Sequence, residues 1–370
     1  MRVALAYRRF GRGAAVPNYC LNLARGLAAT DETWAFTREI DERPPNVQVV
    51  RFPFAFRSKR VEYALNTAVN SSLLRLHRSR QGFDVVHTND GELVGGDVVT
   101  AHSLLRVVFR RFRRTDPEYV AWMPKSPLLW AEDLIYGARR YRRILATSEK
   151  MRAALQDVYR VPARDVALVR LGVDPQVLRP NAAARTAFRR AHGIATDAPV
   201  LLHVSTDFER KGLRTILRAL PRLPADLVLV VAGRERDDRF REFAAKLGVR
   251  QRLLFLGYVP ALETVYPAAD LFVMPTRLDF FGYPVLEAMA CGVPPVVPAD
   301  AGIAEVLSDG RSAFLLADAE DADELVPILQ EALAGRLTTV GREARAIAER
   351  MSTARMVQET RAVYGELARR

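Results

Sequence analysis

Two carboxylates, Asp279 and Glu287, bracket a short segment that reads D-F-F-G-Y-P-V-L-E. An apolar strand expected over residues 271–274 leads into it, and a helix expected to begin near Pro284 carries Glu287 in its first turn. A helix start presents unpaired N–H groups and a positive dipole end, so it favours an anion such as phosphate. Carboxylates accept hydrogen bonds from ligand hydroxyls. Phosphate and hydroxyls together indicate a nucleotide sugar.

This segment, followed by A-M-A-C-G-V-P, resembles the acidic-x7-acidic motif of retaining glycosyltransferases with the GT-B fold. The resemblance is to glycosyltransferase family 4, in which the first acid is usually Glu rather than Asp279. It implies an α/β fold of two Rossmann-like domains whose parallel sheets face each other across a cleft. In the family, Asp279 and the N–H groups of Phe281, Gly282 and Tyr283 would orient the sugar hydroxyls. An ordinary strand–loop–helix turn of an α/β sheet is the simpler alternative.

A second segment, S-T-D-F-E-R-K-G at residues 205–212, places Arg210 and Lys211 just before a helix. Two cations at a helix start are unfavourable unless an anion neutralises them. Fixed cations also stabilise the charge that develops on a leaving diphosphate. The segment resembles the branch that contains the lipopolysaccharide-core glucosyltransferases, in which an Arg-Lys pair binds the diphosphate. Most of the family has Gly-Arg at the position of Ser205 and Thr206.

In the first half of the chain, the small-residue loop F-G-R-G-A-A follows the first strand. The Gly-Gly that is usual in the family corresponds here to Gly13 and Ala14, or to Ala14 and Ala15. Such a loop can turn backbone N–H groups toward a phosphate or a sugar, or can be only a tight turn. His102 follows a strand at a place where a family histidine reaches the donor sugar; the alternative is a polar strand-end residue.

For the nucleoside, we expect backbone groups of Gly257, Tyr258 and Val259 to meet the base, and Glu287 to accept both ribose hydroxyls. The resemblance implies that Asp279, His102, Arg210 and Lys211 act in catalysis. No residue pattern declares a nucleophile. We expect no metal and no cofactor, because the compact acidic cluster near a strand end, residues 235–238, is interleaved with arginines. The nucleotide sugar, a UDP-sugar by the subgroup resemblance, is a donor substrate.

The alternation of apolar β-branched runs with amphipathic segments over 370 residues predicts two parallel sheets. By the family resemblance, we expect an acceptor-side domain over residues 1–170, a nucleotide-sugar domain over residues 171–350, and a final helix over residues 351–370 that crosses back to the first domain. The expected strands of the first domain are 2–7, 47–52, 84–87, 97–101, 144–147 and 166–169. Those of the second are 199–204, 227–232, 253–256, 271–274, 295–297 and 313–316.

The cysteine count and the charge indicate the compartment and the partners of the protein. With two cysteines far apart in sequence, we expect a reducing cytoplasm. The net charge of +12 lies entirely in the first half, above all in residues 104–114 and 139–143. Interleaved apolar residues suggest that residues 104–114 lie in a layer of anionic headgroups, with the protein peripheral at the inner membrane face. These apolar residues are Leu104, Leu105, Val107, Val108, Phe109 and Phe112. RNA binding is the rival, made less favourable by the lack of stacking modules, and a merely solubilising charge is the simpler alternative.

Together with the resemblance, these observations predict a transferase that moves a hexose from a nucleotide-diphosphate sugar to a hydroxyl group. The resemblance implies that the transfer is retaining and favours UDP-glucose as the donor. The acceptor would be a glycan, a glycolipid, or another cell-envelope or natural-product molecule. The absent Gly-Arg and the Asp in place of Glu leave open a non-catalytic nucleotide-sugar-binding or assembly protein. A related GT-B epimerase or phosphorylase is a third alternative.

Overall fold

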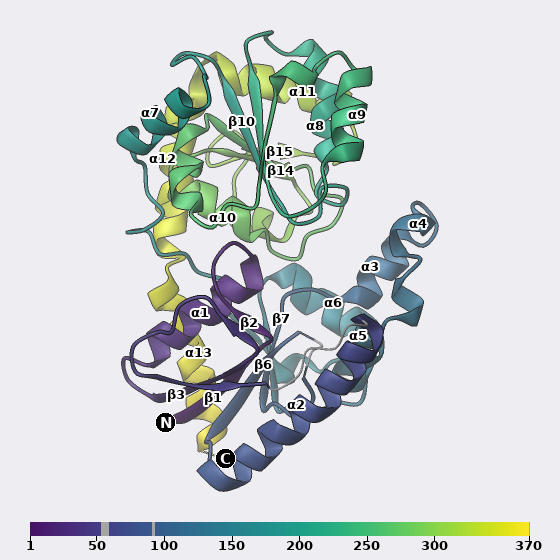
Figure 1. The fold of residues 1–370 in the computed structure, drawn as a ribbon, viewed down its shortest axis with the longest axis vertical. Helices are drawn as coiled ribbons and strands as arrows, with labels where there is room; N and C mark the ends of the chain where they lie inside the picture. The colour runs from purple at the N-terminus through teal and green to yellow at the C-terminus, as the bar shows by residue number, and fades with distance from the viewer. Residues whose placement is uncertain (53–58, 91–92, 370) are drawn as a thin grey trace. The chain divides into compact units, whose positions relative to one another are not determined.

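Two parallel β-sheets, each in its own unit of the chain, make up the protein in a computed structural model that describes residues 1–52, 59–90 and 93–369 (Figure 1). The first unit comprises Met1–Leu171 and Thr353–Arg370, and the second comprises Gly172–Ser352. The α/β fold with two parallel sheets that the sequence predicts is therefore confirmed.

Among the described residues of the first unit, seven parallel strands pair in the order β5-β3-β1-β6-β7-β8-β9. A small separate sheet pairs β2 with β4. The strands are β1 (Arg2–Ala6), β2 (Arg9–Phe10), β3 (Glu32–Thr37), β4 (Glu39–Ile40), β5 (Val47–Arg51), β6 (Val85–Asn89), β7 (Val98–Ala101), β8 (Arg143–Ala146) and β9 (Val166–Leu168).

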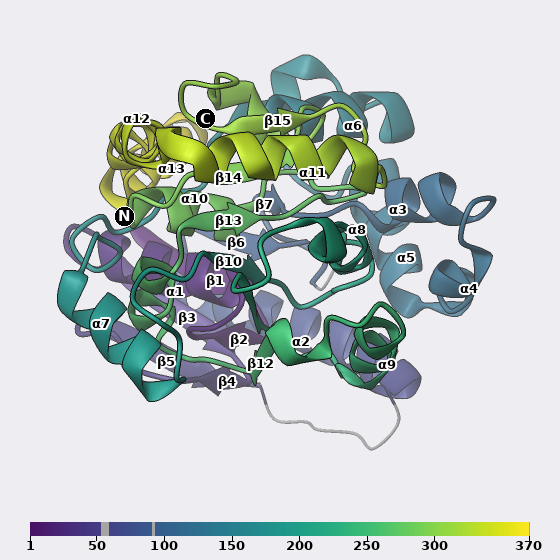
Figure 2. The same cartoon turned by 90° about the horizontal axis from the view of Figure 1, so that it is seen from above.

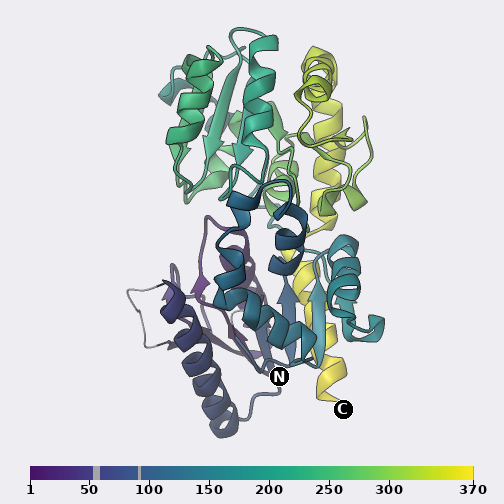
Figure 3. The same cartoon turned by 90° about the vertical axis from the view of Figure 1, so that its right-hand side faces the viewer.

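Helices cover both faces of this sheet, as a parallel sheet requires. They are α1 (Ala15–Leu27), α2 (Lys59–Gln81), α3 (Leu105–Phe112), α4 (Pro117–Val120), α5 (Pro127–Glu132), α6 (Glu149–Tyr159) and α13 (Thr353–Ala368). Leu74 of α2 packs with Ala4 and Val86 on one face. Tyr364 of α13 contacts His87, the next residue of β6, on the other face. Figure 3 shows α2 and α13 on opposite sides of the sheet.

Strand β3 has no counterpart among the strands that the sequence predicts. Its burial pattern shows why, because Thr33 and Thr37 are fully buried although they are polar. Each hydroxyl is satisfied locally: Thr33 Oγ1 donates to the Asp31 carbonyl at 3.1 Å, and Thr37 Oγ1 donates to the Glu39 carbonyl at 2.8 Å. Threonines that bond to nearby carbonyls can occupy a buried strand, so the strand lacks the continuous apolar run from which a buried strand is predicted.

In the second unit, six described strands pair in parallel in the order β12-β11-β10-β13-β14-β15. They are β10 (Val200–Val204), β11 (Val228–Ala232), β12 (Leu253–Gly257), β13 (Leu271–Val273), β14 (Pro295–Pro298) and β15 (Phe314–Leu316). The larger helices are α7 (Ala182–Ala191), α8 (Leu213–Ala219), α9 (Asp238–Lys246), α10 (Tyr283–Ala290), α11 (Ala322–Glu331) and α12 (Leu337–Arg350).

The apolar core of the second unit lies between its sheet and three helices on one face. Ile216 of α8, Phe240 of α9 and Leu325 of α11 pack there against Leu201 and Leu271 of the central strands. Figure 1 shows α8, α9 and α11 on that side and α7, α10 and α12 on the other. Seen from above, α11 lies beside β15 (Figure 2). Central strands buried on both faces explain the continuous apolar runs in the sequence.

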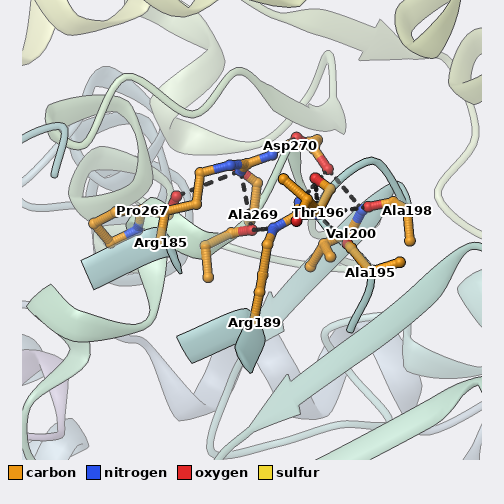
Figure 4. Close-up of polar contacts among 10 residues, drawn as sticks. Arg185, Arg189, Ala195, Thr196, Ala198, Val200, Pro267, Ala269 and Asp270 are labelled. Carbon is orange, nitrogen blue, oxygen red and sulfur yellow. Dashed lines mark hydrogen bonds and ion pairs between the residues drawn. The ribbon is translucent and has the colours of Figure 1, made fainter. Parts of the chain in front are cut away.

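A partly buried ion cluster ties α7 to the starts of β10 and β13 (Figure 4). Asp270 bonds Arg185 Nη2 at 2.6 Å and Arg189 Nη2 at 2.8 Å, and its Oδ2 also accepts from the Val200 N–H at 2.8 Å. Arg189 is only 3% exposed and donates to four backbone carbonyls, those of Ala195, Thr196, Ala198 and Ala268. The cluster therefore satisfies loop carbonyls that burial would otherwise leave unpaired.

Helix α3 corrects one part of the sequence prediction. Leu104, Val108 and Phe112, expected among the apolar contacts with a membrane, are buried inside the first unit. The reason is that the apolar stripe of α3 packs against α4, α5 and α6. Four arginines of this segment are exposed: Arg110, Arg111, Arg113 and Arg114.

Candidate active site

The central feature of the second unit is a pair of loops that leave the carboxyl ends of the neighbouring strands β10 and β13. Ligands of open α/β sheets bind at this edge. The first loop, residues 205–212, ends at Gly212, whose φ of 83° begins α8. The second loop, residues 274–282, ends at Gly282, whose φ of 104° begins α10. Both values favour glycine, because a Cβ is strained in this region.

Several polar contacts join the two loops. The Arg277 N–H donates to the Arg210 carbonyl at 2.8 Å. Arg210 Nη1 donates to the Leu278 carbonyl at 2.7 Å. Lys211 Nζ forms an ion pair with Asp279 Oδ2, and both of these side chains are 12% exposed. The structure thus brings together three residues that the sequence selects as catalytic, although 68 positions separate Lys211 from Asp279.

The Lys211–Asp279 pair shows how charge and burial compete at this point. Burial lowers the pKa of Lys211, and the negative charge of Asp279 only partly opposes that shift. For Asp279, burial favours the neutral acid, but the charges of Lys211 and Arg210 outweigh it and lower its pKa. The carboxylate is therefore ionised and also accepts from the Phe281 N–H at 3.3 Å. A buried pair of this kind is a fixed charge array.

Asp207 is a site residue that the sequence reasoning did not select. Its Oδ2 accepts from Arg210 Nε at 2.9 Å and its Oδ1 accepts from the Arg210 N–H at 3.1 Å. The carboxylate therefore fixes both the loop backbone and the direction of the guanidinium. The D-x-x-R spacing, which suits a side chain that bonds the backbone three residues on, is the signal that could have found it.

The second acid, Glu287, lies one residue further into α10 than the sequence prediction placed it. The helix starts at Tyr283, so Glu287 is its fifth residue and no acid occupies the first turn. Glu287 is buried, and its Oε2 accepts from the Tyr266 hydroxyl at 2.7 Å. The Tyr283 hydroxyl donates to the Gly172 carbonyl at 3.1 Å, which anchors the start of the helix. The carboxylate is thus positioned by a buried phenol.

The residues expected to meet the base lie at the end of β12 and directly after it. Gly257 has a φ of 64°, and its carbonyl accepts from the Gly233 N–H at 2.8 Å. The Tyr258 ring is exposed, and the guanidinium of Arg234 stacks over it at 3.7 Å from the ring centroid. Val259 is half-buried. The sequence did not select Arg234, which this contact joins to the group.

The glycine loop of the first unit contains Gly13, with a φ of 77°, and Ala14, which caps α1 in an extended conformation. Asp41 holds the loop, since its Oδ2 accepts from the Arg12 N–H at 3.1 Å. Helix α1 begins at Ala15, directly after this loop. The loop is therefore a fixed turn beside β2.

His102 follows β7 at the carboxyl edge of the first sheet. Its Nε2 lies 3.0 Å from Asn89 Oδ1, and its backbone N–H donates to Asp90 Oδ1 at 2.8 Å. The ring packs edge-on against Tyr19 of α1, with 4.7 Å between centroids. The Tyr19 hydroxyl bonds Thr100 Oγ1 at 3.0 Å. Neither Asn89 nor Asp90 was selected from the sequence, although both lie within three residues of the end of the strand predicted over residues 84–87.

A second histidine, His87, lies in the middle of β6 and is fully buried. It bonds the Tyr364 hydroxyl at 2.5 Å through Nδ1 and Thr100 Oγ1 at 2.7 Å through Nε2. Burial lowers the pKa of His87 to about 3, so the ring is neutral. It is a structural residue that connects α13 to the sheet.

Across residues 1–52, 59–90 and 93–369, no group of three or more His, Cys, Asp or Glu side chains is arranged to hold a metal ion. Within the same ranges, no helix combines the length and the apolarity that crossing a bilayer demands.

Two family models match the chain in succession. The model described as Glycosyltransferase Family 4 matches residues 16–177, and the model described as Glycosyl transferases group 1 matches residues 184–351. A D-inositol 3-phosphate glycosyltransferase of Mycolicibacterium paratuberculosis is 30% identical over 353 residues, which cover 86% of this chain and 76% of the relative. The chain therefore belongs to the glycosyltransferases of this family, a class of transferases.

Individual relatives refine this assignment. The lipopolysaccharide glucosyltransferase WaaG of Escherichia coli is 31% identical over 154 residues, which cover 40% of this chain and 41% of WaaG. A crystal structure of WaaG matches the fold with a TM-score of 0.82 at 20% identity, over 98% of this chain and 99% of that one. HepE of Anabaena, solved in complex with UDP and glucose, matches with a TM-score of 0.77 at 18% identity, over 99% of each chain.

The alignments with WaaG and with another curated relative span less than half of those relatives' lengths, 41% and 44%. Together with the two parallel sheets, the structural matches establish the GT-B fold that the sequence predicts.

Proposed function

We propose that the protein is a retaining hexosyltransferase whose donor is a nucleoside-diphosphate sugar, with UDP-glucose favoured. The acceptor is a hydroxyl group of a glycan, a glycolipid or another cell-envelope or natural-product molecule. Relatives named for UDP, glucose and lipopolysaccharide support this choice of substrate class. The alternative, a nucleotide-sugar binder without turnover, is separated from it by the experiment below.

The observation that carries the proposal is the joined array of Arg210, Lys211 and Asp279. Asp207 and the Leu278 carbonyl hold the guanidinium in place, so it needs little reorganisation to meet a charge. Cations that are already in position stabilise the negative charge that builds on a leaving diphosphate. The ionised carboxylate of Asp279 accepts hydrogen bonds from sugar hydroxyls.

In the proposed reaction, the bond between the anomeric carbon and the β-phosphate oxygen breaks, and its electron pair leaves with the diphosphate. The acceptor oxygen bonds to the same carbon on the same face. The proton of the acceptor hydroxyl passes to the leaving phosphate oxygen, so no protein nucleophile is required. Arg210 and Lys211 carry the charge on the diphosphate.

The remaining residues take binding roles in this proposal. Glu287 accepts from the ribose hydroxyls, and the N–H groups of Phe281, Gly282 and Tyr283 and the carboxylate of Asp279 orient the sugar. The backbone at Gly257, Tyr258 and Val259 meets the base. His102 bonds a substrate hydroxyl, and the loop at Gly13 and Ala14 presents N–H groups to the substrate.

The experiment is calorimetric titration of UDP into the whole chain and into R210Q and K211Q. Exposed Lys246 of α9 supplies the matched control, K246Q. Each site variant should weaken binding about tenfold to hundredfold, since a charge-assisted bond contributes roughly 1.5–3 kcal/mol. K246Q should bind like the original protein. If UDP does not bind, or binds equally to a double variant of both cations, the proposal fails.

Turnover is tested separately, by following glucose release and transfer from UDP-glucose with and without EDTA. We expect activity that survives chelation, because protein cations take the part of a metal on the diphosphate. Inactivation by EDTA that Mg²⁺ reverses would contradict the metal-independent route. Binding of UDP without any release or transfer over a panel of acceptors would favour the non-catalytic alternative.

We also propose peripheral contact with an anionic membrane through the surface around α3. Two indoles are exposed there, Trp122 at 47% and Trp130 at 62%, and Arg110, Arg111 and Arg114 are exposed on α3 and just after it. Indoles favour the headgroup region, and each basic residue near an anionic surface adds roughly 1 kcal/mol.

Vesicle sedimentation tests this contact. Vesicles with phosphatidylglycerol should bind the protein and vesicles of phosphatidylcholine should not, and W122S/W130S should weaken the binding. An equal response to both kinds of vesicle would end the membrane proposal.

A further inference from the structure

The strand end that carries Asn89 determines the hydrogen-bonding character of the His102 ring. Asn89 is almost fully buried at the end of β6, and its Oδ1 lies 3.0 Å from His102 Nε2. An amide oxygen accepts hydrogen bonds and cannot donate them. The proton of a neutral His102 ring must therefore lie on Nε2, which leaves Nδ1 with an unprotonated lone pair.

Asp90 and Tyr19 also keep the ring in this position. Asp90 Oδ1 accepts from the backbone N–H groups of His102 and Ser103, at 2.8 and 3.1 Å. Asp90 has a φ of 50°, the left-handed conformation that aspartate tolerates better than most residues. The Tyr19 ring packs edge-on, with an interplanar angle of 72°. Rotation of the imidazole would break the Asn89 bond and disturb this packing.

The surroundings of His102 favour the neutral ring. Burial lowers its pKa, and the negative charge of Asp90 opposes this shift only in part. The other titratable groups packed nearby are Tyr19, whose pKa burial raises, and His87, which is neutral. At neutral pH the ring therefore has one donor and one acceptor, and the bond that the donor makes fixes the acceptor.

We propose that Asn89 is a positioning residue that locks His102 in the Nε2–H tautomer, so that Nδ1 accepts a hydrogen bond from a substrate hydroxyl group. The choice of a hydroxyl group as the ligand rests on the proposed function, because the substrates of glycosyl transfer carry hydroxyl groups. The tautomer itself does not depend on that function. His102 then cannot donate to a phosphate or to a carbonyl through Nδ1.

Long-range ¹H–¹⁵N correlation spectroscopy of the whole chain labelled with ¹⁵N-histidine tests the tautomer directly. His102 is assigned by the signal lost in H102Q. We expect a protonated Nε2 and a bare Nδ1. His203 is an internal reference, since its Nδ1 lies 2.9 Å from the Val273 carbonyl and must therefore carry the proton. A protonated Nδ1 in His102 overturns the proposal, whether or not the protein turns over a sugar nucleotide.

Variants connect the tautomer to turnover. N89L removes the acceptor, so we expect a mixed tautomer signal for His102 and a fall in kcat of roughly tenfold, about the loss of one hydrogen bond to the transition state. N89D keeps an acceptor and adds charge, so it should retain the Nε2–H tautomer and move the acid limb of the kcat profile to higher pH. Buried Asn70 of α2 provides the matched control, N70L, which should leave the His102 signals unchanged.

A purely structural role for Asn89 predicts a different result. N89L would then lower the melting temperature while the His102 tautomer and the pH profile of kcat stayed as they were, and this outcome would overturn the proposal. If N89L does not fold, the histidine spectrum of the original chain and the pH profile of kcat for N89D still test the proposal. If the tautomer is as expected but no UDP-sugar is turned over, the proposed function fails and the assignment of Asn89 as a tautomer lock remains.

Discussion

Gly212 passes so close to Pro275 that a Cβ atom at position 212 would lie 1.9 Å from the Pro275 carbonyl oxygen. Real Cβ atoms essentially never approach an oxygen so closely, and the partner atom is rigid backbone. The contact sits directly beside the Lys211–Asp279 pair, so the absence of a side chain at Gly212 allows the two loops to join.

Gly212→Ala should therefore separate the loops and weaken UDP binding together with local stability. We expect a loss on the order of 3 kcal/mol, from overpacking added to an unfavourable φ. Gly248→Ala is the matched control, because Gly248 also has a positive φ of 72° but a Cβ there would meet nothing within 4 Å. The control should lose about 1 kcal/mol and keep UDP affinity. Hydrogen exchange of the β10 and β13 amides measures the stability; equal losses in the two variants would contradict the close-contact argument.

The buried pair of Lys211 and Asp279 should show strong coupling. K211M and D279N each leave one buried charge without its partner, and each should lower local stability by roughly 3 kcal/mol. The double variant removes both charges and should lose clearly less than the sum of the two single losses. Hydrogen exchange of the α8 and α10 amides supplies the three numbers. Additive losses would mean that the ion pair contributes nothing to the join between the loops.

Glu132 should make the first unit less stable as pH rises. It is 3% exposed, and burial raises its pKa to about 7, although the Tyr159 hydroxyl and the N–H groups of Leu105 and Arg106 bond to it and oppose the shift. Between the unfolded value of 4.5 and about 7, the folded chain holds a proton that the unfolded chain has released. Stability therefore falls through this window and is level above it.

The change E132Q should remove this dependence. The difference in unfolding free energy between the original chain and E132Q should change by roughly 3 kcal/mol across the window. All three tryptophans lie in the first unit, so their fluorescence during urea unfolding reports that unit alone. Exposed Glu118 provides the control variant E118Q. Parallel pH curves for E132Q and the original chain would refute the prediction.

Asp270 should be essential for the second unit, because it compensates two arginines at once. D270A leaves the nearly buried Arg189 without its carboxylate and removes the acceptor of the Val200 N–H. We expect a loss of about 3–5 kcal/mol, the usual cost of stranding a buried charge. Exposed Asp197 lies beside the cluster in sequence, and D197A should be close to neutral. Thermal unfolding followed by far-UV circular dichroism compares them; similar melting temperatures would show that carbonyls alone hold Arg189.

Much of the fold could be predicted from sequence because parallel strands that are buried on both faces consist of continuous apolar runs. The β10, β11 and β13 runs are of this kind, and their predicted positions agree with the strands within a residue or so. Strand β3 escaped notice because two of its buried positions are threonines whose hydroxyls bond to carbonyls within two residues. Periodicity does not reveal a polar side chain that is satisfied locally.

The residues of the candidate site likewise include some that could be predicted from the sequence and some that could not. Arg210, Lys211 and Asp279 stand out in sequence because charged residues at strand ends and helix starts are conspicuous. Asp207 and Asn89 do not stand out, since their importance lies in what they hold, and that depends on which strand ends become neighbours. The order of strands in the sheet, which brings β10 beside β13 and β6 beside β7, is the information that local spacing lacks.

Helix α13 has a consequence for biosynthesis. Its Tyr364 and Val357 complete the first unit, against His87 and Gly26, yet the whole of the second unit precedes it in the chain. On the ribosome, Gly172–Ser352 can mature as soon as it emerges, while the half translated earliest must wait for its last helix. The opening half of the polypeptide is thus the last to finish folding, and truncation near residue 352 would leave it permanently unfinished.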